Sequence, residues 1–403
     1  MRHGHSVVFA VVTAGLIVGC GTEPTSPHSE SAALESRPAN AKGAVKFWEA
    51  GAAVAWNEHA GALLAARSGN QSRLYAYLGM AQYRAAEAAA TLPGPHPPIS
   101  AAIGAASATV LKAFFPLDAA AIEAALDAQQ AAHPWPGGKH ADFAAGESIG
   151  RSIGARVNTF ALGDRVNLAD PLLPPHGPPP TGSGNWVYVS GAPIARGNLG
   201  MRTLFLSSPD EFRSPPPPAF GSAEFQAALS EVRSITVNRT PEQLQIALFW
   251  HTNQSPTANG PMNALARELI VRHRRNDLEA ARILFLSGAA AYDALIGCFD
   301  AKYHYWYIRP PQADAAIVPP FPMPPHPSYP SAHSCISGGM TGVLALAFPT
   351  ERDRVEAMAV EASTSRVYAG IHYRFDAVAG LALGRAAAAK AFAADLRQSA
   401  LLP

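Results

Sequence analysis

The sequence predicts an all-α protein built of packed helical bundles. Long alanine-rich segments carry aromatic and aliphatic side chains at helical spacing, and most of them end near glycine or proline. No run of alternating apolar and polar residues is long enough to predict a sheet. Prolines cluster at 170–184 and at 214–220 and interrupt the helical pattern. We therefore expect two four-helix-bundle-like halves joined by proline-rich loops.

The residues before the first helix predict export and a lipid anchor. A basic start is followed by the apolar run SVVFAVVTAGLIVGC, which has the length of a secretory signal. Gly19 directly before Cys20 is typical of bacterial lipoprotein signals, in which the cysteine is lipidated. We expect a signal peptide over 1–19 and a protein held by Cys20 on the periplasmic or extracellular face of a bacterial membrane. An ordinary signal peptide with an incidental cysteine is the alternative.

The rest of the chain divides into four segments. Residues 20–44 are rich in Ser, Pro, Thr and Glu, which indicates a flexible tether after the lipidated cysteine. Residues 45–166 form the N-terminal helical half, 167–220 a proline-rich connection, and 221–403 the C-terminal helical half. The expected helices cover 44–69, 71–94, 98–116, 118–133, 142–164, 222–235, 240–253, 260–275, 276–303, 331–349, 351–370 and 373–396.

Composition argues against two classes of function and limits the cysteine chemistry. A net charge of +1 gives no basic surface of the kind that binds nucleic acid. No uninterrupted apolar run reaches the roughly 18–20 residues of a membrane-spanning helix. Once Cys20 is lipidated, Cys298 and Cys335 are the cysteines that remain. An exported compartment permits a disulfide between them, but we expect two buried thiols.

Three segments in the last third of the chain concentrate charged and nucleophilic side chains. They are KYHYWYIRP, with Lys302 and Arg309; YPSAHS, with Ser331 and His333; and SRVYAGIHYRFD, with Arg366, His372 and Asp376. A serine-hydrolase triad needs one nucleophile, one base and one acid, and would leave three cations without a role. Three fixed cations beside a serine hydroxyl instead favour a site for a highly charged oxyanion. The planar fork of arginine matches such anions, and lysine adds a point charge.

The order and spacing of these segments resemble a known family. The patterns K-x6-R-P, P-S-A-H and S-R-x5-H-x3-D look like the signature of the type 2 phosphatidic acid phosphatase and vanadium haloperoxidase superfamily. The resemblance extends to residues 207–218 and 249–270, and it leans toward the haloperoxidase branch. It therefore implies an all-α fold and a bound vanadate or phosphate.

The resemblance implies which residues hold the oxyanion. Lys302, Arg309 and Arg366 would bind the equatorial oxygens of vanadate or phosphate, and Ser331 and the N–H of Ala332 would donate as well. The family usually has glycine at position 332. Alanine keeps the N–H but does not readily adopt a positive φ. If this turn requires a left-handed residue, we expect a distorted site with lower oxyanion affinity.

The resemblance also implies roles for four other side chains. His372 would be the axial ligand of vanadium or the nucleophile that takes a phosphoryl group, with His333 as the acid–base partner on the other side. Asp376 follows His372 by four residues and could orient its ring if a helix begins at this histidine. His326 stands where chloroperoxidase-type relatives tend to carry phenylalanine and bromoperoxidase-type relatives histidine. An imidazole there would favour bromide or iodide over chloride; a surface histidine in a proline loop is the alternative.

We expect a haloperoxidase that oxidises halide with hydrogen peroxide at a protein-bound vanadate, with vanadium acting as a Lewis acid. The first alternative is a phosphatase, in which His372 attacks a phosphomonoester and His333 protonates the leaving oxygen. The second is a non-catalytic lipoprotein that binds oxyanions, and Ala332 is its only support. Exposed helix faces could support a homodimer, but the sequence does not specify one.

Overall fold

The computed structural model of the chain describes residues 51–67, 69–92, 97–132, 141–166, 180–187, 198, 201–252 and 259–396. The chain divides into two compact units, Met1–Ala44 and Val45–Pro403. All described residues belong to the second unit. The predicted signal peptide, the lipid anchor at Cys20 and the tether lie outside the described residues, as does most of the first proline cluster.

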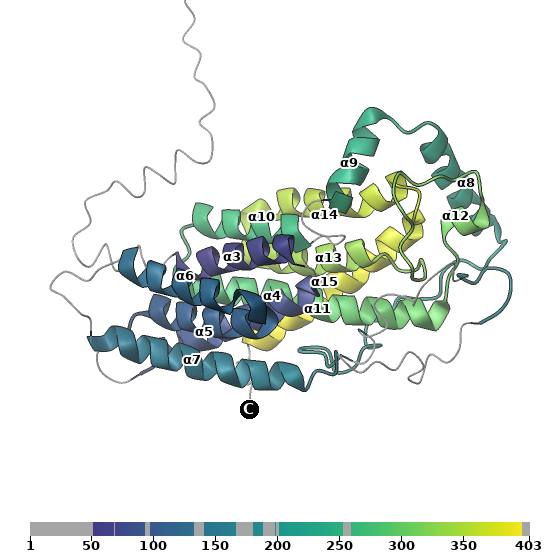
Figure 1. The fold of residues 1–403 in the computed structure, drawn as a ribbon. Helices are drawn as coiled ribbons and strands as arrows, with labels where there is room; N and C mark the ends of the chain where they lie inside the picture. Colours follow the sequence, from purple (N-terminus) through teal and green to yellow (C-terminus); the bar gives the residue numbers. More distant parts are fainter. Residues whose placement is uncertain are drawn as a thin grey trace, which may run out of the picture. The chain divides into compact units, whose positions relative to one another are not determined.

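Five α-helices lie in the described residues before position 167, as predicted. They are α3 (Ala52–Ala66), α4 (Gln71–Ala90), α5 (Ile99–Phe114), α6 (Ala119–Ala132) and α7 (Ala141–Leu162) (Figure 1). Alanine dominates their sequences because it has the highest helix propensity and lets helices approach closely. A 3-10 turn, Pro116–Asp118, joins α5 to α6.

The C-terminal helices follow the second proline cluster. They are α8 (Ala223–Val237), α9 (Pro241–Thr252), α10 (Asn259–Arg272), α11 (Asp277–Tyr305), α12 (Pro310–Ala313), α13 (Ala332–Ala347), α14 (Arg352–Tyr368) and α15 (Arg374–Leu396). Within the described ranges there is no strand, and the sole strand-like pairing is an isolated bridge between Asn185 and Tyr307. The all-α prediction is confirmed.

Helix α11 is the centre of the fold and contacts α4, α13 and α15 (Figure 1). The neighbouring helices approach it closely because glycine stands at the contacts. A Cβ added to Gly79 of α4 would lie 2.6 Å from the Cα of Phe285, and one added to Gly339 of α13 would lie 2.8 Å from the carbonyl oxygen of Ala290. The N-terminal and C-terminal helices thus share one core around α11.

The start of α11 fixes the start of α3. Asn276 and Glu279 form a capping box at the N-terminus of α11. The next side chain, Asp277, accepts hydrogen bonds from the N–H groups of Ala52 (3.2 Å) and Ala53 (3.0 Å). A carboxylate at a helix N-terminus satisfies orphan donors and interacts favourably with the helix dipole. One acidic residue of α11 therefore caps a helix more than 200 positions earlier in the chain.

Asp293, in the middle of α11, anchors residues 204–206 of the proline-rich connection. Its fully buried carboxylate accepts hydrogen bonds from the backbone N–H groups of Leu204 (2.7 Å), Phe205 (2.7 Å) and Leu206 (3.0 Å). Burial raises the pKa of Asp293 to about 6, against the lowering effect of these three N–H donors. At neutral pH the carboxylate is therefore ionised and holds the segment against the core.

Replacing Asp293 by asparagine is expected to lower the free energy of unfolding by about 2–4 kcal/mol. The amide keeps one acceptor oxygen but turns its NH₂ group toward backbone donors, which leaves buried N–H groups without a partner. Denaturant unfolding followed by circular dichroism measures the change. The matched control is Asp353→Asn, which alters an exposed carboxylate on α14; equal stability loss in both variants would contradict the assigned role.

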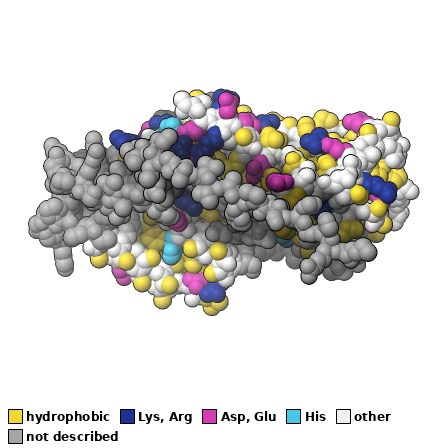
Figure 2. All heavy atoms as spheres, turned by 90° about the horizontal axis from the view of Figure 1, so that it is seen from above, with side chains coloured by type: hydrophobic (Ala, Val, Ile, Leu, Met, Phe, Trp, Pro, Cys, Tyr) yellow, Lys and Arg dark blue, Asp and Glu magenta, His cyan; other side chains and the backbone are white. Residues whose placement is uncertain are grey.

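Two described helices, α11 and α15, are long and apolar enough by length and composition to cross a membrane. The apolar window of α11 is entirely buried inside the fold, and that of α15 is 44% buried. The central position of α11 accounts for its composition without a membrane. On the face drawn in Figure 2, the described basic and acidic side chains lie beside one another, with apolar ones dispersed among them.

Candidate active site

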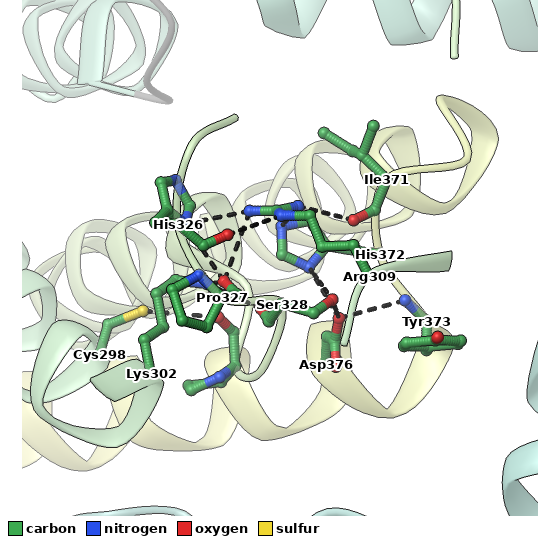
Figure 3. A network of polar contacts seen from close by, with 11 residues as sticks. Cys298, Lys302, Arg309, His326, Pro327, Ser328, Ile371, His372, Tyr373 and Asp376 are labelled. Atoms are coloured by element: carbon green, nitrogen blue, oxygen red, sulfur yellow. Dashed lines mark hydrogen bonds and ion pairs between the residues drawn. The ribbon is translucent and has the colours of Figure 1, made fainter. Parts of the chain in front are cut away.

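The structure brings the predicted site residues together from the ends of five helices. Helix α11 ends one turn after Lys302, where Trp306 adopts a left-handed conformation (φ 48°). The other positions are Arg309 at the N-cap of α12, Ser331 at the N-cap of α13, Arg366 in the last turn of α14, and His372 and Asp376 at the start of α15. The three sequence segments thus meet in space, as the oxyanion hypothesis requires. Figure 3 shows Lys302 and Arg309 of the first segment beside His372 and Asp376 of the third.

Lys302 and Arg309 bind the loop before α13. The ammonium of Lys302 donates to the carbonyl oxygens of Pro327 (2.8 Å) and Ser328 (2.7 Å). Arg309 donates from Nε to the carbonyl oxygen of His326 (2.8 Å) and from Nη1 to that of Ile371 (2.7 Å). These cations therefore fix the loop and the residue before His372. Since lysine has three N–H donors, one remains for a ligand.

Arg366 and His333 are positioned by the carbonyl groups of α9. Arg366 donates from Nη2 to the carbonyl oxygen of Ala247 (2.8 Å) and from Nε to the hydroxyl of Ser365 (2.9 Å). The Nε2 atom of His333 lies 2.9 Å from the carbonyl oxygen of Trp250. Because a carbonyl only accepts, the proton of His333 is on Nε2, and Nδ1 carries the lone pair. Sequence reasoning missed these partners, since a backbone carbonyl has no residue-type signal.

The three cations carry buried positive charge, and the carboxylate of Asp376 acts on Lys302 and Arg309 through its charge rather than through a direct ion pair. Lys302, Arg309 and Arg366 are each at most 1% exposed, and within the described part of the chain none forms an ion pair with a carboxylate. Burial lowers the pKa of Lys302 to about 8, that of Arg309 to about 10 and that of Arg366 to about 9. Burying an unpaired charge costs several kcal/mol. An anion bound between these cations would offset that cost.

Ser331 and Ala332 add donors at the N-terminus of α13. The hydroxyl of Ser331 is buried and has no hydrogen-bond partner among the described residues. Ala332 is the first residue of the helix, where backbone N–H groups lack intrahelical acceptors and attract anions. Ala332 is not among the described residues with positive φ, so the distortion expected if this turn needed a left-handed residue does not arise. Alanine is compatible with a working site.

His372 and Asp376 form a buried pair. The Nδ1 atom of His372 lies 2.7 Å from Oδ2 of Asp376, and Nη1 of Arg309 lies 3.4 Å from Nε2 of the same ring. Because carboxylates accept and guanidinium groups donate, the proton of His372 is on Nδ1 and the lone pair on Nε2. Helix α15 begins at Arg374 rather than at the histidine, so the contact forms across the turn before the helix. Burial and the nearby cations lower the pKa of His372 well below its usual value.

Ser328 is a site residue that sequence reasoning missed. Its hydroxyl donates to Oδ2 of Asp376 (2.5 Å) and lies 3.4 Å from Nδ1 of His372 (Figure 3). A single serine in a proline-rich loop gives no spacing signal, so only the three-dimensional arrangement reveals the contact.

His326 lies against Arg309. Its Nδ1 is 3.0 Å from Nη2 of Arg309 and 3.2 Å from the carbonyl oxygen of Pro327. The shorter contact is to a guanidinium, which only donates, so Nδ1 accepts and the ring proton is on Nε2. The ring also packs edge-on against Phe299, with centroids 5.2 Å apart. Burial and the charges of Lys302 and Arg309 lower the pKa of His326 well below its usual value. It is therefore a neutral imidazole in contact with a predicted site cation, not an isolated surface side chain.

The remaining singled-out side chains have structural surroundings. Cys298 and Cys335 are both free and buried, which confirms the expected thiols. His273 contacts Glu351 at 3.0 Å, in line with its expected structural role. His251 stacks face to face on Phe321, with ring centroids 3.8 Å apart, at the edge of the site.

Three tyrosine hydroxyls hold the proline run 214–218 beside the site. Tyr305 donates to the carbonyl oxygen of Ser214 (2.7 Å), Tyr307 to that of Pro218 (2.6 Å) and Tyr329 to that of Pro215 (2.6 Å). We call these contacts the tyrosine–proline clamp. Two of the tyrosines follow Lys302 and the third precedes Ser331, so the clamp supports both loops that carry site residues.

These side chains fit a tetrahedral oxyanion. Lys302, Arg309, Arg366, Ser331 and the N–H of Ala332 form what we call the oxyanion cradle. The hydroxyl of Ser331, which has no partner among the described residues, and the third N–H of Lys302 would both gain an acceptor from a vanadate or phosphate ion. The lone pair on Nε2 of His372 faces the same region, because Arg309 contacts that atom.

Comparison with known proteins agrees with this geometry. Residues 281–398 match the PAP2 superfamily. A structure described as the first bacterial vanadium-dependent iodoperoxidase has a TM-score of 0.65 and 22% identity, covering 92% of this chain and 97% of that chain. An apo form of a bacterial vanadium-dependent chloroperoxidase has a TM-score of 0.65 and 13% identity, covering 80% of this chain and 92% of that chain. A holo form of a bacterial vanadium-dependent chloroperoxidase has a TM-score of 0.62 and 13% identity, covering 91% of this chain and 97% of that chain. No curated protein sequence matches significantly.

The family match contains all three site segments, from Lys302 to Asp376. The fold similarity reaches well beyond it, over most of the chain. Residues 281–398 are thus similar to the PAP2 superfamily, and the chain shares its fold with bacterial vanadium-dependent haloperoxidases.

Proposed function

We propose that the protein is a vanadate-dependent haloperoxidase that oxidises halide with hydrogen peroxide. The observation that carries the proposal is the oxyanion cradle: among the described residues its three buried cations form no ion pair with a carboxylate, and the buried hydroxyl of Ser331 has no hydrogen-bond partner. Such a site binds a highly charged tetrahedral anion more readily than a neutral substrate. The fold shared with the haloperoxidase structures over most of the chain supports halide oxidation over ester hydrolysis.

The residues of the cradle would hold the oxyanion and its charge. Lys302, Arg309 and Arg366 would bind the oxygens through charge-assisted hydrogen bonds, and Ser331 would donate its hydroxyl. His372 would present the lone pair of Nε2, while Asp376 keeps the proton on Nδ1. Bound vanadate would supply a Lewis-acid centre that polarises hydrogen peroxide.

His333 would move protons during the reaction. Burial and the charge of Arg366 lower the pKa of His333 well below its usual value, so the ring is neutral at pH 7. Its Nε2–H is committed to the carbonyl oxygen of Trp250, which leaves Nδ1 as the acceptor. Nδ1 would take a proton from entering peroxide and return it to the oxygen that departs. The halide is oxidised by two electrons as the peroxide O–O bond breaks.

The superfamily match also supports a second function, hydrolysis of phosphomonoesters. The same lone pair on Nε2 of His372 can attack a phosphoryl group held in the cradle, and His333 can then protonate the leaving oxygen after loading a proton. This reaction needs no vanadate. The requirement for vanadate therefore distinguishes the two functions experimentally.

The test divides purified full-length protein, freed of bound oxyanions, into two portions. One receives orthovanadate, hydrogen peroxide and bromide with a dye whose absorbance changes on bromination. The other receives p-nitrophenyl phosphate without vanadate. Bromination that depends on vanadate supports the haloperoxidase. Ester hydrolysis without bromination identifies the phosphatase instead, and no turnover in either portion contradicts both.

We further propose that bromide and iodide are preferred over chloride. His326 accepts a hydrogen bond from Nη2 of Arg309, so part of the donor capacity of that guanidinium is spent on the ring. Fewer donors then remain for the oxyanion, and peroxide is less strongly polarised. Weaker polarisation favours iodide and bromide, because these halides are oxidised more easily than chloride.

Replacing His326 by phenylalanine is expected to raise the ratio of chloride to bromide turnover by about 10-fold, the equivalent of one hydrogen bond returned to the oxyanion. Initial rates with each halide, at saturating vanadate, measure the ratio. His304→Phe serves as the control because His304 is exposed at the end of α11. An unchanged ratio in His326→Phe would show that this ring does not set the halide preference.

A further inference from the structure

Ser328 is fixed in space by both of its backbone groups. Its N–H donates to the carbonyl oxygen of Tyr307 (2.9 Å), and its carbonyl oxygen accepts from the ammonium of Lys302 (2.7 Å). The residue is fully buried. The backbone therefore leaves the side chain little freedom, and the direction of its hydroxyl is set by the fold.

The hydroxyl of Ser328 completes a set of donors around one carboxylate oxygen. Oδ2 of Asp376 accepts from Ser328 Oγ (2.5 Å), from His372 Nδ1 (2.7 Å) and from the N–H of Tyr373 (3.2 Å) (Figure 3). The other oxygen, Oδ1, is buried and has no partner among the described residues. All of the restraint on this carboxylate is thus concentrated on Oδ2.

We propose that Ser328 is a positioning residue that holds Asp376, and through it the imidazole of His372, in the orientation that presents Nε2 to the oxyanion. Rotation of aspartate about Cβ–Cγ is only weakly restricted by the side chain itself. Without the Ser328 hydroxyl, the donors that remain on Oδ2 among the described residues are His372 and, at a longer distance, the N–H of Tyr373. The carboxylate can then turn, and the ring loses the acceptor that fixes its proton on Nδ1.

The position of Ser328 distinguishes it from an ordinary buried serine. The hydroxyl of a buried serine often donates a hydrogen bond to a nearby carbonyl oxygen of its own helix, as that of Ser365 does to Ala362 (2.5 Å). The Ser328 hydroxyl instead crosses to a residue 48 positions away, while its backbone contacts Lys302 and Tyr307 of the first site segment. One residue therefore connects the lysine, the proline-rich loop and the histidine–aspartate pair.

The inference rests on the proposed function of the same site, and its test uses readouts that do not depend on turnover. Full-length protein labelled with ¹⁵N-histidine, without added oxyanion, is compared as wild type, Ser328→Ala and Ser328→Cys. The chemical shifts of the two ring nitrogens report the tautomer of His372, assigned by its loss in His372→Ala. Calorimetric titration with orthovanadate reports affinity. Bromination and phosphatase rates are then measured for the same samples.

In wild type, His372 is expected in the Nδ1–H tautomer. Ser328→Ala should give a mixture of tautomers and an affinity or turnover lower by about 10- to 100-fold, the usual effect of losing an outer partner of a ligand histidine. Ser328→Cys keeps a similar shape with a weaker donor and should fall between them. It also provides the test if the alanine variant fails to fold.

Ser337→Ala is the matched control. Its hydroxyl is also buried and has no partner among the described residues, so its removal costs no hydrogen bond. An unchanged His372 tautomer in Ser328→Ala, or equal changes in Ser328→Ala and Ser337→Ala, would overturn the assignment. If Ser328→Ala shifts the tautomer of His372 but the wild-type protein shows neither bromination nor phosphatase activity, the positioning role stands and the proposed function is overturned.

Discussion

His372→Ala is expected to lower turnover by at least about 10³-fold while the fold is retained. The Nε2 lone pair of His372 faces the cradle because its Nδ1–H is committed to Asp376. Alanine removes that lone pair and leaves every cation of the cradle in place. Phosphate, which the cradle holds by hydrogen bonds alone, should still bind within about 10-fold of the wild-type affinity. Bromination rates and calorimetric titration with phosphate measure the two effects.

The comparison with a second histidine variant makes this result specific. His304→Ala changes an exposed histidine near the end of α11, and should leave turnover unchanged. If His372→Ala retained more than a tenth of the wild-type rate, His372 would be a structural residue. Loss of phosphate binding together with turnover would instead point to collapse of the cradle.

Lys302→Met should weaken oxyanion binding by about 100-fold or more, the range seen when one member of a buried charge pair is truncated. Methionine has a similar length, but it removes the charge and the donors that Lys302 gives to Pro327 and Ser328. A lower melting temperature is therefore also expected. Lys390→Met is the control, since Lys390 pairs with Glu211 at the surface.

The pH dependence of binding gives Lys302 a separate test. Burial lowers the pKa of Lys302 to about 8, so its charge is present below that pH and lost above it. Wild-type affinity for orthovanadate or phosphate should therefore fall as pH rises through about 8. Burial raises the pKa of Asp376 to about 6, and affinity should also fall below that pH as the carboxyl group becomes a poorer acceptor for His372. Lys302→Met should lose the alkaline fall and keep the acid one; a retained alkaline fall would assign it to another group.

Features that depend on short stretches of chain could be predicted from the sequence. The five helices before the connection follow from alanine content and helical spacing, and the structure has them. The site residues could be named because three short segments resemble a family signature, in which Lys302 and Arg309, or Arg366 and His372, stand at matching separations. Such a resemblance can be recognised without knowledge of the fold.

Features that depend on contacts between distant segments could not be predicted. The carbonyl groups of Ala247 and Trp250 position Arg366 and His333, but any residue type supplies a carbonyl. The doubt over Ala332 concerned a backbone angle, which the N-terminus of α13 decides. The role of Asp376 depended on where α15 begins, and the contact forms although the helix starts two residues after His372.

The tyrosine–proline clamp affects the entropy of the site. A run of prolines has few conformations in the unfolded chain, so ordering residues 214–218 costs less conformational entropy than ordering a loop of other residues. Proline also lacks an N–H, so the run brings carbonyl acceptors and no buried donors that need a partner. Tyr305, Tyr307 and Tyr329 are therefore held by a segment whose ordering loses little conformational entropy. The cradle is preorganised by a segment that takes no part in the chemistry, and binding energy need not be spent on ordering it.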